Sequence, residues 1–290
     1  RWLFGEGDGL PGVVVDLYGR FAVTALYADG LERIAEWVAE ALRGTTELAG
    51  ILLRRRGSDG GLEVVWGRRP PAELLVEEHG VRMCADLEAG QKTGLFLDHR
   101  ENRRFVGSVA AGRRVLNLFS YTGAFSLHAA LQGATHVTSV DVASGATAAA
   151  RENFRLNGLD VDAHDFVVAD VFEYLEQAKS DGRVFDLVIS DPPSFAKSKQ
   201  QQKQALRAYV KLNSLALRAT AVGGLFAAAS CTSQVGPEAF RQTLAEAASR
   251  AKRRLQIIHE AGQPADHPVF AQHLEGRYLK FMVGRALGPA

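Results

Sequence analysis

Hydrophobic and polar positions follow two different patterns along the chain. Up to about residue 88, short apolar runs alternate with polar residues and are separated by turn residues, which is typical of strands in hairpins. From about residue 101, short apolar runs alternate with longer stretches of helical spacing. The change in pattern predicts two domains, over residues 1–88 and 89–290.

The pattern in the first part predicts a small α+β domain with hairpins, which we interpret as a substrate- or RNA-recognition domain. Its expected elements are a hairpin over 9–27 that turns at Tyr18-Gly19-Arg20, a helix over 31–44, strands over 50–56 and 62–67, and a hairpin over 74–87 that turns at His79-Gly80.

The second part predicts an α/β fold of the Rossmann type, because alternating strands and helices build a parallel sheet with helices on both faces. The strands are expected over 114–119, 136–141, 165–170, 185–190 and 224–230, and two more over 255–262 and 277–286. The helices are expected over 124–133, 146–158, 171–179, 207–220 and 238–252.

Composition narrows the function classes. A hydrophobic content of 47% and a charged content of 23% are ordinary for a globular protein, and no apolar run is long enough to cross a membrane. Two cysteines exclude a disulfide framework and favour a cytoplasmic protein. The net charge is only +1, but basic residues are clustered, and local clusters can bind phosphates. The candidates for such contacts are Arg54, Arg55, Arg56, Lys197 and Lys199.

Candidate ligand-binding residues follow the first three strands of the second domain, where parallel sheets bind their ligands. The turn "SYTGAF" (120–125) follows the first strand, and Asp141 and Asp170 follow the next two. Each acid alone could simply cap a helix. The turn contains one glycine, Gly123, rather than the G-x-G-x-x-G that a dinucleotide's pyrophosphate needs. The combination favours S-adenosylmethionine, a nucleoside cofactor without a pyrophosphate.

The stretch "ISDPPSFAKSK" (189–199) ends the fourth strand in an acid, two prolines and an aromatic residue. Prolines stop a strand and stiffen the chain that follows. Asp191 and Phe195 would then be held rigidly, as an edge and a plane for a nucleobase, with Pro192 and Pro193 between them. The alternative is an ordinary turn in which Asp191 is a capping acid.

Six motifs give the chain a specific resemblance. They are "EGDGLPGVVVDLYG" (6–19), "EEHG" (77–80), "GQKTGLFLDHRENR" (90–103), "NLFSYTGAFSLHAA" (117–130), "DPPSFAKSK" (191–199) and "ADHPV" (265–269). Together they resemble the RlmI-like family of class I S-adenosylmethionine-dependent methyltransferases, which modify C5 of cytosine in large-subunit ribosomal RNA. The resemblance implies a mixed seven-stranded sheet and ribosomal RNA as the partner. Members usually begin with a small PUA domain, which no segment here matches.

The resemblance also implies a set of site residues. Lys92, Thr93 and Gly94 are expected near the methionine end of the cofactor. The cofactor loop is expected to contain Asn117, Phe119, Tyr121, Thr122 and Gly123. Asp141 is expected at the ribose, Asp170 at the adenine, and Asp191 at the methyl-transfer site. We assign no metal ligands, and a homodimer is one candidate assembly.

The role of Cys231, at the end of the fifth strand, distinguishes methylation of a ring carbon from methylation of an exocyclic amine. Cytosine C5 is a poor nucleophile until a thiolate adds at C6, and family members carry cysteine at this position. The competing hypotheses are an RNA guanine-N2 or adenine-N6 methyltransferase in which Cys231 is idle, and a catalytically silent RNA-binding module. Cys84 is interpreted as a packing residue. The base that removes the C5 proton stays open between Asp191, His267 and a water molecule.

Overall fold

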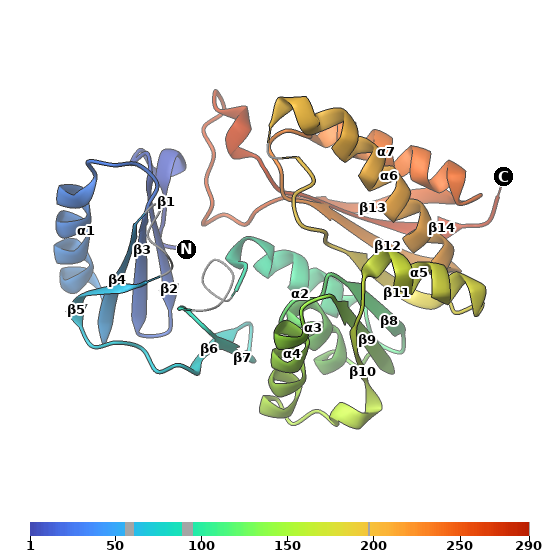
Figure 1. Cartoon of the computed structure of the whole chain (residues 1–290), viewed down its shortest axis with the longest axis horizontal. Coiled ribbons are helices and arrows are strands. Elements are labelled where there is room, and N and C mark those ends of the chain that lie inside the picture. The colour runs from blue at the N-terminus through green and yellow to red at the C-terminus, as the bar shows by residue number, and fades with distance from the viewer. Residues whose placement is uncertain (56–60, 89–94, 197, 290) are drawn as a thin grey trace. The chain divides into compact units, whose positions relative to one another are not determined.

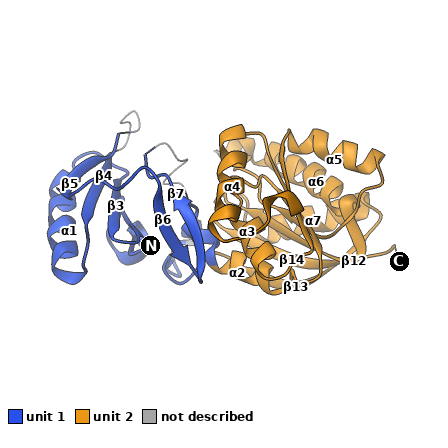
Figure 2. Cartoon of the chain, turned by 90° about the horizontal axis from the view of Figure 1, so that it is seen from below, with its two compact units in different colours: residues 1–100, 264–276 blue, residues 101–263, 277–290 orange. Residues whose placement is uncertain are grey.

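A computed structural model describes residues 1–55, 61–88, 95–196 and 198–289. Its contacts divide the chain into two compact units (Figure 2). Unit 1 contains Arg1–Arg100 and Pro264–Gly276, and unit 2 contains Glu101–Gln263 and Arg277–Ala290. Compared with the expected boundary at residue 88, this division extends the first unit and adds a segment from the C-terminal part of the chain. The functions of the two domains stay predictions.

Unit 1 is built on a five-stranded sheet in the order β1-β2-β3-β4-β5 and a two-stranded sheet, β6-β7. The strands are β1 (Leu3–Phe4), β2 (Val13–Tyr18), β3 (Phe21–Leu26), β4 (Gly50–Arg55), β5 (Glu63–Gly67), β6 (Leu74–Glu78) and β7 (Val81–Ala85). Helix α1 (Glu32–Thr45) connects the parallel strands β3 and β4. Its buried residues Ala35, Ala39 and Leu42 recur at helical spacing and join the core of the unit.

Both predicted hairpins of unit 1 are confirmed. Tyr18 pairs with Phe21 in one, and Glu78 pairs with Val81 in the other, so each turn contains two residues. In the second turn His79 and Gly80 both have positive φ, at 51° and 80°. Two left-handed residues give a turn whose twist matches that of the flanking strands.

Unit 2 contains a seven-stranded sheet in the order β10-β9-β8-β11-β12-β14-β13, which confirms the expected mixed sheet. The strands are β8 (Arg114–Leu118), β9 (His136–Asp141), β10 (Asp165–Val168), β11 (Phe185–Ser190), β12 (Thr220–Ser230), β13 (Arg254–Ala261) and β14 (Lys280–Leu287). The first five strands of this order are parallel, and β14 runs antiparallel to both of its neighbours.

The helices of unit 2 form layers on the two faces of its sheet (Figure 1). They are α2 (Arg100–Ser108), α3 (Ala124–Leu131), α4 (Ser144–Leu156), α5 (Val171–Ser180), α6 (Gln202–Ala219) and α7 (Pro237–Arg250). Met282 and Ala286 of β14 lie in the main apolar cluster with residues of α5, α6 and α7. Phe281, the neighbour of Met282 in the strand, points to the opposite face and stacks on Phe125 of α3, with ring centroids 6.0 Å apart. Neighbouring residues of β14 therefore face different helix layers.

The structure shifts some expected boundaries. Helix α6 begins at Gln202 rather than 207, and β10 ends at Val168 rather than 170. The shorter strand has a local cause, because Asp170 caps helix α5 and so belongs to that helix. Helix α2 was not predicted from the apolar pattern, since its sequence, "RENRRFVGS", is dominated by charged residues.

Candidate active site

The loop from β8 to α3 has an unusual backbone. Phe119 and Tyr121 have positive φ, at 57° and 47°, and Gly123 has φ 77°. Left-handed conformations are costly for residues with a side chain and often occur at functional sites. The N–H of Ser120 donates to the Val140 carbonyl at 3.0 Å, which ties this loop to strand β9. The expected cofactor loop is therefore a tight turn held by its neighbours.

Gly123 packs closely against helix α4. A Cβ atom at this position would lie 2.8 Å from the Cβ of Ala150, so a side chain would push the loop away from the helix. Asn153 of α4 also holds the loop, since its Nδ2 donates to the Thr122 carbonyl at 2.9 Å. Helix α4 thus supports the turn from one side.

Asp141 connects the ends of two adjacent strands. Its Oδ2 accepts a hydrogen bond from the Tyr121 N–H at 2.8 Å, and its Oδ1 accepts one from the Ala143 N–H at 2.9 Å. A carboxylate oxygen can accept more than one hydrogen bond, so both oxygens retain capacity for the hydroxyls of a ribose. The structure places Asp141 where the sequence expected it, beside the glycine turn.

Polar side chains lie buried behind the loop. Asn117 Nδ2 donates to Ser126 Oγ at 2.9 Å, and Ser139 Oγ donates to the same oxygen at 2.7 Å. Three further buried atoms, Oδ1 of Asn117, Oγ of Ser120 and Oγ1 of Thr122, have no hydrogen-bond partner within the described residues. Buried polar atoms without partners are costly, and a polar ligand would satisfy them. One acceptor and two hydroxyls, which can donate or accept, fit the polar groups of S-adenosylmethionine.

Two exposed valines flank Asp141, and the sequence interpretation missed them. Val142 follows Asp141 and is 72% exposed, and Val168, the register partner of Asp141 on β10, is 53% exposed. Two apolar side chains at adjacent strand ends offer a surface for a flat ring such as adenine. The signal in the sequence was an apolar residue close to each strand-end acid, directly after Asp141 and two residues before Asp170.

Asp170 has a structural role that its sequence position left open. Its Oδ1 accepts hydrogen bonds from the N–H groups of Phe172 at 2.8 Å and Glu173 at 3.1 Å, which makes it the N-cap of α5. The expected contact with the adenine stays a prediction.

The Asp-Pro-Pro turn follows directly on β11. Pro192 is buried and Pro193 is exposed, so the first proline fixes the turn in the protein interior. Phe195 is half-buried and packs edge-on against Tyr209 of α6, with ring centroids 4.9 Å apart. Its expected role as a stacking plane for a base stays a prediction.

Cys231 leaves the sheet next to that turn. Ser190 at the end of β11 pairs with Ala228 of β12, so the two loops emerge from adjacent parallel strands. Thr232 Oγ1 donates to the Ala196 carbonyl at 2.9 Å and joins the loops directly. Cys231 itself is half-buried and is not part of a disulfide. The strand order thus brings the expected nucleophile and Asp191 to one end of the sheet.

A buried lysine, which the sequence interpretation missed, lies beside Cys231. Lys280 is 2% exposed, and its Nζ donates to the carbonyls of Thr232 and, at 2.8 Å, Tyr278. Burial lowers the pKa of Lys280 to about 8, although the negative charge of a Cys231 thiolate acts in the opposite direction. In the sequence, the indication that this lysine is buried is its position within the apolar run "YLKFMV" (278–283).

Tyr209 belongs to the same cluster. Burial raises its pKa to about 12, and the negative charges of Cys231 and Asp191 add to this rise. The phenol is therefore neutral at physiological pH, and its hydroxyl lies in the electrostatic range of both expected catalytic residues.

Several expected contact residues carry other bonds or lie outside the described residues. Arg54 donates to the Leu87 carbonyl at 2.7 Å, and Arg55 forms an ion pair with Glu63. Lys199 is exposed. The expected residues outside the described ranges are Lys92, Thr93, Gly94, Arg56 and Lys197.

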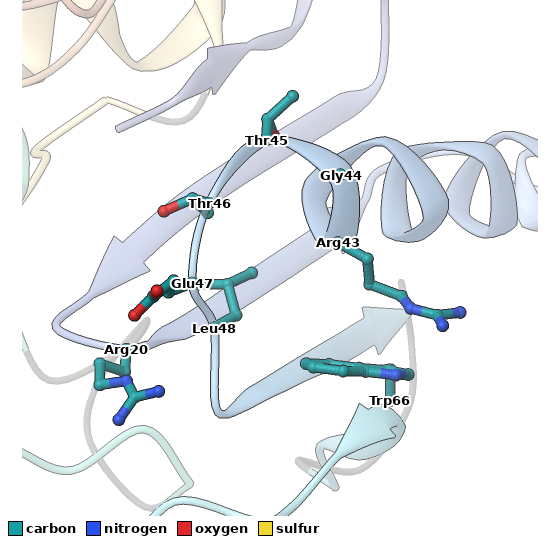
Figure 3. A pocket seen from close by; sticks show the side chains of 8 residues that line it. All are labelled: Arg20, Arg43, Gly44, Thr45, Thr46, Glu47, Leu48 and Trp66. Atoms are coloured by element: carbon teal, nitrogen blue, oxygen red, sulfur yellow. The ribbon is translucent and has the colours of Figure 1, made fainter.

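Unit 1 has a cavity of about 470 Å³ at the end of helix α1 (Figure 3). Arg20, Glu47 and Trp66 line it, and the Arg43 guanidinium lies over the Trp66 ring at 5.3 Å from its centroid. None of the residues expected in catalysis or cofactor binding is among its lining residues. The cavity is therefore lined by residues other than those expected at the strand-end site.

None of the helices in the described ranges is both long and apolar enough to cross a membrane. Within the same ranges, His, Cys, Asp and Glu side chains form no group of three or more that could hold a metal ion.

Comparison with known proteins agrees with this geometry. Residues 24–276 match the family described as S-adenosylmethionine-dependent methyltransferase. The ribosomal RNA large subunit methyltransferase I of Erwinia tasmaniensis is 38% identical over 297 residues, which covers 99% of this chain and 74% of that protein. The protein of the same name from Photobacterium profundum is 39% identical over 287 residues, covering 97% of this chain and 72% of that protein.

A solved structure shares the fold and holds a related ligand. The crystal structure of SMU.776, complexed with SAH, matches with a TM-score of 0.88 and 31% identity, over 97% of this chain and 74% of that one. SAH is the product that S-adenosylmethionine leaves after methyl transfer. The glycine turn, Asp141 and the buried polar atoms fit this cofactor. The chain therefore belongs to the S-adenosylmethionine-dependent methyltransferases of the RlmI-like ribosomal RNA large-subunit family.

Proposed function

We propose that this enzyme methylates C5 of a cytosine in large-subunit ribosomal RNA, with Cys231 as the nucleophile. The names of its relatives support the RNA substrate. The observation that supports the choice of atom is the position of Cys231 at the end of β12, next to the Asp191 turn, with the two loops joined by the bond from Thr232 to Ala196. An amine methyltransferase needs no thiol at this position, because an exocyclic amine supplies its own electron pair.

The cofactor supplies an electrophilic methyl group, and residues at the ends of the first three strands hold it. Asp141 accepts the ribose hydroxyls, and Asp170 lies on the adenine side with Val142 and Val168. The loop residues Asn117, Phe119, Tyr121, Thr122 and Gly123 surround the rest of the cofactor. For Lys92, Thr93 and Gly94, which lie outside the described residues, the role at the methionine end is the one that the family resemblance implies.

The reaction starts when the Cys231 thiolate adds to C6 of the cytosine, which moves electron density to C5. C5 then forms a bond to the methyl group as the sulfur–methyl bond breaks. Asp191 binds the N3/N4 edge of the base, and Phe195 stacks on its plane. Pro192 and Pro193 hold these two residues in place.

The product forms when a base removes the C5 proton, the C5–C6 double bond returns and the thiolate leaves. Asp191 and a water molecule are the candidates for that base. His267 has a packing role in unit 1, where it is 2% exposed, its Nδ1 interacts with Asp266 at 2.9 Å and its ring lies 5.0 Å from that of Phe4.

An RNA that contains 5-fluorocytosine tests the mechanism. Fluorine replaces the proton that must leave, so methyl transfer should leave Cys231 covalently joined to the RNA. Cys231→Ala should bind the cofactor normally, form no adduct and lose methylation by several orders of magnitude. Cys84→Ala is the matched control and should retain both the adduct and the activity.

Each contrary outcome points to one alternative. Full methylation by Cys231→Ala, with the product found on guanine N2 or adenine N6, would establish an amine methyltransferase. RNA binding with no methylation by the parent enzyme would indicate a silent binding module.

A further inference from the structure

Lys280 is unusual because its ammonium group is buried inside the sheet–helix core. Alternation along β14 puts it on the same face as Met282 and Ala286, which pack in the apolar cluster with α6 and α7. Lysine is almost never fully buried without a partner, because removing an ammonium from water is costly. A buried charge in this position calls for a compensating group.

The surroundings of the ammonium lead to Cys231. Lys280 pairs across the antiparallel ladder with Ser230, the residue before Cys231. Its Nζ donates to the carbonyl of Thr232, the residue after Cys231. In the part of the chain that the structure describes, the hydrogen bonds of Nζ go to carbonyls rather than to a carboxylate. The ammonium group of Lys280 is therefore anchored to the backbone next to Cys231.

We propose that Lys280 is a positioning residue for Cys231, and that its buried ammonium stabilises the thiolate both when it attacks C6 and when it leaves. This inference rests on the proposed role of Cys231 as nucleophile. The interaction is reciprocal, because a thiolate that stabilises the ammonium is itself stabilised by the same free energy. The thiol proton passes to water, and the lysine retains its own proton throughout.

The other ionisable groups near Cys231 cannot stabilise a thiolate, so a cation is needed for that purpose. Asp191 lies at the end of the adjacent strand, and its negative charge opposes a second anion nearby. Tyr209 of α6 stays neutral and cannot compensate a thiolate by charge. Lys280 is the cation that the sheet places at Cys231.

The test measures the reactivity of both thiols in the parent protein. Iodoacetamide alkylates thiolates, so the rate at each cysteine, followed by peptide mass spectrometry across pH 6–10, gives its pKa. Cys231 should titrate below the ordinary thiol value of about 8.5. Cys84 is the internal control, because burial and the nearby Glu73 and Asp86 raise the pKa of its thiol. A Cys231 that titrates at or above the ordinary value would overturn the proposal, and this measurement needs no variant.

Two variants then assign the effect to Lys280. Lys280→Met keeps the length of the side chain, and Lys280→Gln keeps a donor for the Thr232 carbonyl, but neither carries a charge. Both should raise the pKa of Cys231 by about one unit or more, which slows alkylation at pH 7 about tenfold. Lys179→Met, at an exposed lysine of α5, should change nothing. Binding of SAH measured by calorimetry checks that each variant is folded.

The result separates this inference from the proposed function. Alkylation needs neither RNA nor cofactor, so an unchanged Cys231 pKa in folded Lys280 variants refutes the role of Lys280 even if Cys231 is essential. Conversely, an active Cys231→Ala enzyme would refute the nucleophile, and the shifted pKa would remain as a property of the pair without a catalytic use.

Discussion

The Tyr121 backbone N–H donates to the Asp141 carboxylate across 2.8 Å, so the acid expected at the ribose also holds the cofactor loop in its left-handed conformation. One side chain thus has two tasks. It fixes the turn that precedes helix α3, and we propose that its oxygens also accept the ribose hydroxyls of the cofactor.

Replacing Asp141 should therefore weaken cofactor binding more than the loss of one ribose contact would. In Asp141→Asn one oxygen becomes an amide nitrogen, which cannot accept the hydrogen bonds now made by Tyr121 or Ala143. We expect SAH affinity to fall by about tenfold or more, since hydrogen bonds to charged groups contribute roughly 1.5–3 kcal/mol. Calorimetry measures the affinity. Asp181→Asn, at the far end of α5, is the control, and an Asp141 variant that binds like the parent would disprove the assignment.

Gly123 should tolerate no side chain. Gly123→Ala forces a residue with a Cβ to φ 77° and brings that Cβ within 2.8 Å of Ala150. Gly223→Ala tests the backbone strain alone, because Gly223 has φ 84° with nothing within 4 Å of its Cβ position. We expect Gly223→Ala to cost about 1–2 kcal/mol of stability and Gly123→Ala more.

Gly145→Ala is the matched control for this pair, because Gly145 lies in helix α4 with open space around it. Alanine should stabilise the helix there by up to about 1 kcal/mol. Thermal unfolding of the three variants gives the order. A Gly123→Ala protein as stable as Gly223→Ala would show that the contact with Ala150 is not limiting.

The stability of unit 1 should depend on the charge of Asp266. Burial on its own would raise the pKa of this carboxyl, but hydrogen bonds from Arg100, at 2.7 Å, from His267 and from the Arg1 amino group together outweigh burial and hold the pKa well below its usual range. A carboxyl with a lowered pKa stabilises the folded state above the unfolded value of about 3.9, and this contribution is lost as the pH falls below it.

Asp266→Asn should accordingly be less stable than the parent at pH 7, by roughly 2 kcal/mol. The difference should shrink as the pH falls from 4 towards 2. Thermal melting across this range measures it. Asp162→Asn, whose parent side chain is 83% exposed, should follow the parent at every pH. A constant difference at all pH values would show that the Asp266 charge is not involved.

RNA binding should weaken as salt rises, and the exposed basic residues of the segment after the Asp-Pro-Pro turn are the candidates. Lys199, Lys203, Arg207 and Lys211 recur every four residues and are all exposed. Each phosphate contact to a single strand contributes about 0.7 to the slope of log affinity against log salt. A Lys203→Ala/Arg207→Ala double variant should reduce the slope by about 1.4. Arg250→Ala, on α7, should leave it unchanged. An equal slope in the double variant would remove these residues from the RNA interface.

The apolar pattern predicted the sheet of unit 2 well, since strands β9 and β11 begin and end at the expected residues. Buried parallel strands read as continuous apolar runs, so their limits are visible in the sequence. Boundaries set by side-chain hydrogen bonds were less visible. Asp170 ends one element and caps the next, and only its bonds to Phe172 and Glu173 show which element it belongs to.

Candidate site residues at strand ends and in turns could be predicted from the sequence. Residues that contacts between distant segments bring to the site could not. Asp141 and Gly123 follow from strand ends and turn composition. Lys280 does not, because its partner carbonyl at Thr232 is 48 residues away and only the pairing of β12 with β14 brings them together. The resemblance to known methyltransferases also gave no indication of this lysine.

Residues 264–276 belong to unit 1, although strands of unit 2 precede and follow them in the chain. The bond from Arg100 to Asp266 joins residues 166 positions apart. Domains generally fold in the order in which the ribosome releases them, and contacts of long sequence separation form slowly. Here that order is broken, since the bonds of Asp266 cannot form during the synthesis of residues 1–100. Unit 1 is completed only after most of the methyltransferase sheet has left the ribosome.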